Sequence, residues 1–510
     1  MTKPVLRPGE TCWRIARADR VAVIVDADAY FRCVKDAILQ ARHSVLLIGW
    51  DFTTDIGLDR DDPAPGVPNT LGGLLNHAAA HNKNLDIYLL RWDLAFLRAP
   101  FRGTTPLFLL NLIAHPRLHF HLDSHHPSEG CHHQKIAVID DAIAFCGGID
   151  ITVGRWDTPA HLDDDPRRVT PDGTPHGPWH DVTTAVDGEA AKALGELARQ
   201  RWFLGEGRRI EPPPPGQVRW PEGLRAEFHG VDVAIARTEP RYDGQPEVHE
   251  IEALYLAAIR AAQRCIYLES QYFSASIIAN AVLDRLREPG GPEVVVVNPH
   301  EMEGWLEEET MGTSRAVLVE RLRAADHENR FRIYTPVTEE GRDIYVHAKV
   351  LVVDDTLLRV GSSNINNRSL GLDTECDLAV EARPGEPHLE EVRHAILQVR
   401  DALLAEHLGV ERDELRRVIA ACDGSVVRAL EQLVRPHGRS LRPFHPQHLS
   451  PLQRRLGESH VLDPRRPEPM DRTFVRTMRV LGPRHAVASG LGVLALAAAV
   501  ALDIRRGGRS

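Results

Sequence analysis

Lysine is scarce in this chain of 510 residues, because only six of its 61 basic side chains are lysines. Cysteine is scarce as well, with seven residues that are widely scattered and form no C-x-x-C pair. An odd number of isolated cysteines excludes a regular disulfide framework, offers no zinc signature and is typical of reduced thiols in the cytosol. The formal net charge of −11 argues against a protein that binds nucleic acid over a broad surface.

Long apolar runs are almost missing too. Residues 1–20 lack the apolar segment of a signal peptide. The long uncharged run at residues 486–502 has 17 residues, which is the lower limit for a helix that spans a bilayer. We expect a membrane tail at 485–504 that attaches the protein to the cytoplasmic membrane with its folded part in the cytoplasm; the alternative is a buried C-terminal helix. Arginines on both sides leave the orientation open.

The same order of elements is expected twice, on either side of a run of four prolines at residues 212–215. In each half, a segment with helical apolar spacing leads into a continuous apolar strand, and further apolar strands follow. The corresponding segments are 28–42 and 250–264 for the helix, 44–52 and 265–273, 85–93 and 293–299, and 118–123 and 331–335 for the strands. This duplication predicts an α/β protein of two α/β/α sandwich lobes with mixed central sheets and one active site between them.

Boundaries follow from the same patterns, since four prolines cannot continue a helix or a central strand. We expect an N-terminal lobe at 1–210, a Pro-rich linker at 211–227, a C-terminal lobe at 228–404, accessory helices at 405–435, a second linker at 436–484 and the tail at 485–504. Residues 158–179 are rich in Pro, Gly and Asp and have no counterpart in the second half. They predict a long loop over one face, a form that loops often take near binding sites.

Two of the six lysines belong to a repeated motif, H-x-K-x-x-x-x-D. Its residues are His133, Lys135 and Asp140 in the first half, and His347, Lys349 and Asp354 in the second. Alternate residues of a strand share a face, so each His–Lys pair is expected to point into one cavity. Composition alone would produce two such matches about once in a thousand chains. A similar H-x-K at His81 has a tyrosine at the eighth position, and we give it no role.

Two histidines and two lysines suit the chemistry of a phosphodiester. The lysines offset the charge of the anionic oxygens, and donors such as Ser362 and Asn364 can add hydrogen bonds. One neutral imidazole can attack phosphorus, while the second, protonated, can donate to the leaving alkoxide and then take a proton from the acceptor. The lysines and the imidazolium supply the positive charge, so we expect no metal and no cofactor. The sequence indicates no convincing carboxylate–histidine metal cluster.

Each half also contains an acid that could hold the second nitrogen of a histidine ring and fix its tautomer. These acids are Asp181 and Glu375, which stand at matching points just before a later strand. The motif aspartates Asp140 and Asp354 belong to the catalytic motif, although closing the strand–turn unit suggests a structural role for them.

At this point the residues resemble the phospholipase D superfamily, whose defining feature is two such motifs. The resemblance covers about residues 10–400 and is closest to the eukaryote-like branch, through segments at 49–52, 147–158, 178–182, 267–273 and 361–369. It implies a bilobal α/β/α fold and a phosphohistidine intermediate. It also implies hydrolysis of glycerophospholipids, such as phosphatidylcholine, to phosphatidic acid, or transfer of the phosphatidyl group to an alcohol.

The resemblance further implies roles that the residues alone do not assign. His133 would be the nucleophile, His347 the acid and later the base, and Lys135, Lys349 and Asn364 the groups that hold the phosphate. The first half departs from the second because Asp150 stands where the second has Asn364. An aspartate would repel a phosphodiester, so we assign Asp150 no phosphate-binding role.

Several residues are candidates for contact with the substrate. They are Ser362, Asn364, Arg155, Trp156, Glu269, Gln271 and Tyr272. An aromatic ring such as that of Trp156, Trp179 or Tyr272 would suit the quaternary ammonium of choline.

Three other functions fit parts of the pattern. Cardiolipin synthase-like transfer is disfavoured because an N-terminal membrane hairpin is missing, and a nuclease-type phosphodiesterase is disfavoured by the negative charge and the scarce lysine. A non-catalytic lipid-binding or scaffold protein would tolerate loss of one motif histidine, yet both are present. We expect a monomer that acts on phospholipid at a membrane surface, with water or an alcohol as acceptor and no nucleic acid. The head group and the preferred acceptor stay open.

Overall fold

The computed structural model describes residues 4–466, except 62, 64, 94–114, 128, 215–218, 303–310, 387, 447–448 and 460–462. The tail predicted at 485–504 therefore lies outside the described residues, as does the end of the linker expected before it. Within the described part of the chain, no helix is long and apolar enough to cross a membrane.

The first lobe alternates strands and helices in the expected order. Its elements are β1 (Arg14–Val25), α1 (Ala27–Gln40), β2 (Ser44–Gly49), α2 (Leu71–His81), β3 (Asp86–Trp92), β4 (Leu118–Asp123), β5 (Ile136–Ile139), β6 (Ile143–Gly147), β7 (Trp179–His180), β8 (Val182–Asp187) and α4 (Gly188–Glu206).

The second lobe repeats this order after the proline run. Its elements are β9 (Phe228–Glu239), β10 (Val248–His249), α5 (Glu250–Ala261), β11 (Cys265–Glu269), α6 (Ser276–Arg287), β12 (Glu293–Val297), α8 (Thr313–Ala325), β13 (Phe331–Val337), β14 (Tyr345–Val346), β15 (Val350–Val353), β16 (Leu357–Gly361), α9 (Asn367–Gly371), β17 (Glu375–Glu381) and α10 (Leu389–Leu408).

A C-terminal part follows, with α11 (Arg412–Ala421), α12 (Val426–Leu433), β18 (Ser440–Pro443) and α13 (Pro451–Ser459). The two accessory helices were expected within 405–435. The stretch expected to be a linker is partly folded instead, because β18 adds an antiparallel strand to β13.

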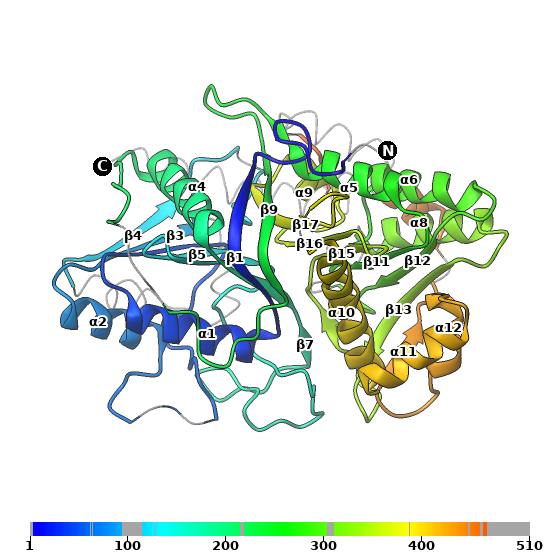
Figure 1. Ribbon diagram of the computed structural model, residues 1–510, viewed down its shortest axis with the longest axis horizontal. Coiled ribbons are helices and arrows are strands. Elements are labelled where there is room, and N and C mark those ends of the chain that lie inside the picture. Colours follow the sequence, from blue (N-terminus) through cyan, green and yellow to red (C-terminus); the bar gives the residue numbers. More distant parts are fainter. Residues whose placement is uncertain are drawn as a thin grey trace.

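The central sheet confirms the duplication (Figure 1). From one end to the centre its order is β4-β3-β2-β5-β6-β8-β1, and from the other end it is β13-β12-β11-β15-β16-β17-β9, with β18 added beyond β13. In both lobes three parallel strands are followed by antiparallel ones. The lobes were expected to have separate sheets; the structure joins them into one sheet because β1 and β9 pair antiparallel along most of their length.

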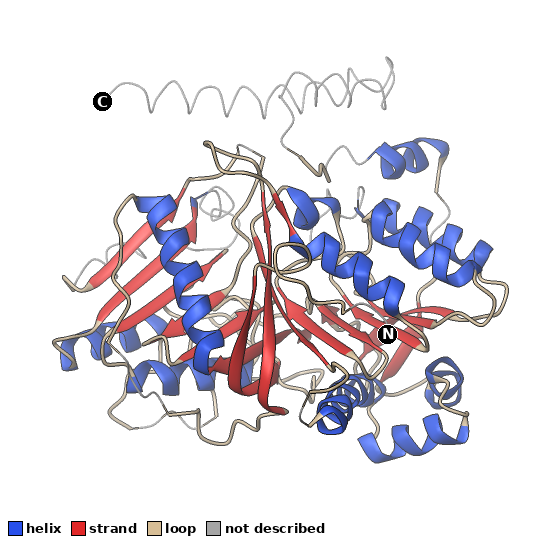
Figure 2. Cartoon of the chain, turned by 45° about the horizontal axis from the view of Figure 1, so that its top comes forward, coloured by secondary structure: helices blue, strands red, loops and turns tan. Residues whose placement is uncertain are grey.

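Helices cover both faces of this sheet (Figure 2). Alternate residues of β2 illustrate why, since Leu46 and Ile48 enter one core cluster while Val45 and Leu47 enter another. The first of these clusters contains apolar residues of α4 and α10 and is continuous through both lobes. The second contains residues of α1 and α2, and a third contains residues of α5 and α6. Burial on both faces explains the continuous apolar runs of these strands.

The motif aspartates hold the fold together at the end of the motif strand away from the histidine. The Asp140 carboxylate accepts three backbone N–H groups at 2.7–2.8 Å, from Arg42, His43 and Ser44. Asp354 does the same at 2.8 Å for Gln263, Arg264 and Cys265. Each carboxylate thus ties a turn to the start of a neighbouring strand, β2 or β11. Asp140 and Asp354 were counted with the catalytic motif, but their carboxylates accept backbone N–H groups, which supports the structural role that the sequence also suggested for them.

Replacing Asp140 with alanine should therefore lower stability. Three charge-assisted hydrogen bonds are lost and the backbone N–H of Ser44 becomes buried without this partner, which should cost roughly 2–4 kcal/mol. Urea unfolding of Asp140→Ala measures this cost. Asp141→Ala is the matched control, since Asp141 shares the left-handed backbone (φ 51°) but pairs with Arg199 instead. Equal urea-unfolding midpoints for Asp140→Ala and Asp141→Ala would contradict the stabilising role of Asp140.

Candidate active site

Each motif histidine is held by a carboxylate of the opposite lobe. The Nδ1 atom of His133, just before β5, lies 3.0 Å from both carboxylate oxygens of Glu375 at the start of β17. The Nδ1 atom of His347, just before β15, lies 2.7 Å from Oδ2 of Asp181, which precedes β8. Both acids were predicted from the sequence as histidine partners. The sequence did not predict their crossed arrangement, in which each lobe orients the other's histidine.

Backbone pairing between the lobes makes the crossing possible. The backbone N–H of His133 donates to the carbonyl of Thr374 at 2.9 Å, next to Glu375. Symmetrically, the N–H of His347 donates to the carbonyl of His180 at 2.8 Å, next to Asp181, where β14 and β7 form a short parallel pair. The interlobe strands therefore set the position of each ring relative to its acid.

The two lysines lie on the same face as their histidines, as their i, i+2 spacing predicts. Each ammonium donates to the carbonyl of its own motif histidine. Lys135 also forms an ion pair with Asp150, with Nζ 3.1 Å from Oδ2. Lys349 has no ion-pair partner among the residues that the structure describes, and the turn of its lobe has Asn364 where the first has Asp150.

Burial and neighbouring positive charge favour the neutral form of both imidazoles. Burial, and next the charges of the two lysines, lower the pKa of His133 well below its usual value. Burial, and next Lys349 and Arg155, do the same to His347. With Nδ1 directed at a carboxylate, Nε2 is the nitrogen available for chemistry in each ring.

Burial also shifts the other ionisable groups of the site. It raises the pKa of Glu375 to about 8 and that of Asp181 to about 6. It lowers the pKa of Lys349 to about 7, so this ammonium loses its proton near neutral pH unless an anion binds. A bound anion would raise the pKa of Lys349 and of both imidazoles, because it stabilises their charged forms.

Five predicted substrate contacts remain near the motifs, and one of them, Arg155, lies against Trp179. Ser362 donates its hydroxyl to Glu375 and accepts the N–H of Cys376 at 3.0 Å, so it supports the orienting acid. Asn364 is buried, and its Oδ1 has no hydrogen-bond partner among the described residues. The Gln271 amide joins the hydroxyls of Tyr272 and Tyr345, at 3.1 and 2.9 Å.

Arg155 and Trp179 lie beside the second histidine. The Arg155 guanidinium stands 4.1 Å from the centre of the Trp179 ring. That ring is 5.3 Å from the His347 ring and stacks on Tyr345 at 4.5 Å. Trp179 is thus part of the wall next to His347.

Two of the predicted substrate contacts are wrong. Trp156 is fully buried in the core of the first lobe, with the Arg60 and Arg167 guanidinium groups 4.7 and 5.1 Å from its ring. Glu269 is also fully buried and is held by His180 and His407, at 2.9 and 3.0 Å. Neither side chain is exposed to a ligand. The Trp156 ring packs in the hydrophobic core of the first lobe, and the Glu269 carboxylate belongs to a buried polar cluster with His180 and His407.

That buried cluster could hold a divalent cation. Four of its ligand atoms converge within 4.8 Å of one another, from Asp26, His161, His180 and Glu406. The Glu406 carboxylate lies 3.1 Å from each of the two imidazoles, and Asp26 lies 3.4 and 3.6 Å from them. Ligands of a tetrahedral ion with bonds of about 2.0–2.1 Å would lie about 3.3 Å apart.

The ring nitrogens of His161 and His180 that do not face Glu406 are each held by a further carboxylate. Nδ1 of His161 lies 2.9 Å from Asp157, and Nε2 of His180 lies 2.9 Å from Glu269. Carboxylates in this position orient metal-ligating histidines. The expectation that the chain has no carboxylate–histidine cluster is therefore wrong. Its members span positions 26–406 with no local spacing, so no sequence motif could reveal them.

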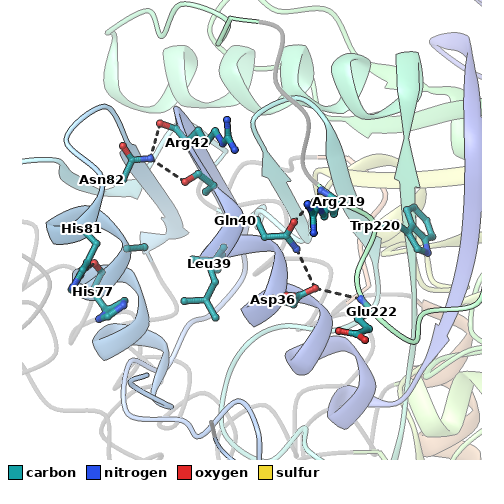
Figure 3. Close-up of a pocket in the computed structure, with 13 residues that line it drawn as sticks. Asp36, Leu39, Gln40, Arg42, His77, His81, Asn82, Arg219, Trp220 and Glu222 are labelled. Carbon is teal, nitrogen blue, oxygen red and sulfur yellow. Dashed lines mark hydrogen bonds between the residues drawn. The ribbon is translucent and has the colours of Figure 1, made fainter. Parts of the chain in front are cut away.

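A surface cavity of about 700 Å³ lies elsewhere, between α1, α2 and residues 219–222 (Figure 3). Its polar groups largely satisfy one another, since Gln40 bonds both Asp36 and the backbone of Arg219. His81, from the incomplete motif, lines this cavity, and none of the motif residues does. The structure therefore separates the incomplete motif from the candidate site.

Fold and site together define a duplicated α/β protein in which two H-x-K motifs share one site. A family model described as Phospholipase D matches residues 125–211 and 319–451. The chain is 27% identical over 520 residues to "Phospholipase D alpha 1" of Carica papaya, covering 74% of this chain and 64% of that protein. It is 24% identical over 554 residues to "Phospholipase D delta" of Arabidopsis thaliana, with coverage of 75% and 64%.

By this family model and these curated relatives, the chain is similar to phospholipase D proteins. It spans slightly less than two thirds of the length of these curated relatives. Among solved structures, a phosphatidylserine synthase of Haemophilus influenzae Rd KW20 matches with a TM-score of 0.48 at 13% identity, over 81% of this chain and 95% of that one.

The pKa of Lys349 predicts how anion binding should vary with pH. Because this ammonium loses its proton as pH rises through about 7, sulfate affinity should fall about tenfold between pH 6.5 and 8.5. Ionisation of Glu375 near pH 8 acts in the same direction. Isothermal titration calorimetry with sulfate measures the effect, and Lys349→Met isolates the lysine by flattening the step near pH 7. A wild-type sulfate affinity that stays unchanged up to pH 8.5 would contradict the lowered pKa of Lys349.

Proposed function

We propose that the protein is a phosphodiesterase and phosphatidyltransferase of the phospholipase D type, which hydrolyses glycerophospholipids to phosphatidic acid or transfers the phosphatidyl group to an alcohol. One observation carries the proposal: two neutral imidazoles with their Nδ1 atoms on carboxylates share a site with two buried lysines. The names of the curated relatives support the same reaction.

In the first step, Nε2 of His133 attacks phosphorus and the bond between phosphorus and the head-group oxygen breaks. Glu375 stabilises the positive charge that develops on the attacking ring. His347, protonated once the anion has bound, gives its Nε2 proton to the leaving oxygen. The lysine ammonium groups offset the charge that grows on the phosphoryl oxygens. The products are the free head-group alcohol and a phosphatidyl–His133 intermediate.

In the second step, His347 is neutral and acts as a base. It takes a proton from water or an alcohol, whose oxygen attacks phosphorus while the bond to His133 breaks. Water yields phosphatidic acid, and an alcohol yields a new phosphodiester. His347 is thereby protonated again, as it was once the anion had bound, with its Nδ1 on Asp181.

We also propose that a single chain suffices and that it works at a membrane surface. Both crossed histidine–carboxylate pairs are formed within one chain, which supports a monomer. The uncharged run inside 485–504 supports attachment to the membrane through the C-terminal end, with water and small alcohols as acceptors.

Purified protein, mixed phospholipid vesicles and dilute ethanol test this proposal, with mass spectrometry for phosphatidylethanol. Wild type should form phosphatidylethanol and phosphatidic acid. His133→Ala and His347→Ala should each lose at least about a hundredfold in rate, since general acid–base catalysis and the nucleophile are removed.

The incomplete motif provides a matched control for these substitutions. His81→Ala changes a histidine two residues before a lysine, as in the active motifs, but on the exposed end of α2. It should retain wild-type rates. Product formation that survives in His133→Ala, or no lipid product from folded wild type, would refute the proposal. Lipid-joining or nucleic-acid substrates would then be examined.

A further inference from the structure

The two halves of the site differ in charge although the fold is duplicated. Lys135 is paired with Asp150 at 3.1 Å, and both side chains are almost fully buried. Lys349 in the second lobe faces no such carboxylate among the described residues, and the neutral Asn364 occupies the position that corresponds to Asp150. One lysine is therefore paired directly with a carboxylate, whereas the acids Asp181 and Glu375 act on the other but form no ion pair with it among the described residues.

Asp150 is fixed in this role by its second oxygen. Its Oδ1 accepts the backbone N–H of Trp50 at 3.1 Å, and that of Asp51 at 3.4 Å, in the turn after β2. The neighbouring Asp51 carboxylate is itself paired with Arg91 at 2.7 Å. Asp150 therefore cannot rotate away when a ligand approaches, and its charge stays beside Lys135.

The negative charge of Asp150 also affects the pKa of His133, the reacting histidine. Burial and the two lysines lower the pKa of His133, while Asp150 opposes that shift. The other ionisable groups that act on the two histidines and on Lys349 include Arg155, Asp181, Glu375 and Asp373. The carboxylate of Asp150 thus reduces the net positive charge that the site offers to a phosphate group.

We infer that Asp150 is a specificity-determining residue that tunes the site to the single negative charge of a phosphodiester and against the double charge of a phosphomonoester. This inference rests on the proposed function, whose substrate is a diester and whose hydrolysis product is a monoester. A phosphomonoester carries about −1.5 to −2 charges at neutral pH, with its second pKa near 6. With Asp150 offsetting the charge of Lys135, the site offers less net positive charge to the doubly charged product, which favours its release.

Ethyl phosphate and diethyl phosphate test the inference, because they differ only in the second ester and hence in charge. Their dissociation constants are measured by ³¹P NMR titration of the full chain at pH 7.5. Asp150→Asn keeps an oxygen for the Trp50 N–H but removes the charge. It should shift the ratio of the two affinities toward ethyl phosphate by about tenfold, which corresponds to about 1.4 kcal/mol.

The duplicated fold supplies matched controls. Asn364→Asp adds a carboxylate beside Lys349 and should shift the ratio the opposite way. The double variant moves the charge from one lobe to the other and should restore a ratio near that of wild type. At pH 5, where ethyl phosphate is mostly a monoanion, the effect of Asp150→Asn should largely disappear.

The inference would be overturned if Asp150→Asn and Asn364→Asp changed the affinities for ethyl phosphate and diethyl phosphate equally, or left both unchanged. It would also be overturned if the wild type bound neither phosphate ester. If Asp150→Asn fails to fold, as thermal unfolding would reveal, Asn364→Asp alone still decides. The vesicle assay separates the two proposals: wild type that lacks lipid turnover but shows the charge-dependent ratio would refute the proposed function and leave the charge role of Asp150 standing.

Discussion

The arrangement of the whole site depends on two hydrogen bonds that cross between the lobes. Glu375 of the second lobe holds the imidazole of His133, and Asp181 of the first lobe holds that of His347. Neither lobe can present an oriented histidine alone. The edge pairing of β1 with β9, and the short interlobe backbone pairs beside each histidine, are therefore requirements of the site as well as of the fold.

The duplication explains why both lobes supply the same types of site residue. Small differences between the lobes make the two halves of the site unequal. The two lobes supply the same histidine, lysine and orienting acid, and their motif aspartates cap equivalent strand starts. The differences are a carboxylate beside Lys135, an amide in the corresponding place of the second lobe, and a polar cluster centred on His180. Because His180 also accepts the backbone N–H of His347, an ion or a proton in that cluster would act next to the second histidine.

Much of the fold was predictable because it follows from local periodicity. The helical spacing before residues 44 and 265, the continuous apolar strands and the i, i+2 placement of histidine and lysine all depend on neighbours in sequence. The site was predictable only in part. The pairing of His133 with Glu375 joins residues 242 positions apart, and the cluster of Asp26, His161, His180 and Glu406 draws on four separate segments. Trp156 and Glu269 were misassigned because nothing in their local sequence distinguishes a buried partner from an exposed one.

The crossed pairing itself can be observed by ¹⁵N NMR of histidine-labelled protein, which reports the tautomer and protonation of each ring. Glu375→Gln should disturb the signals of His133, in the opposite lobe, and leave those of His347 nearly unchanged, while Asp181→Asn should do the reverse. That result would establish that each lobe orients the histidine of the other. A Glu375→Gln variant that alters His347 and spares His133 would contradict the account.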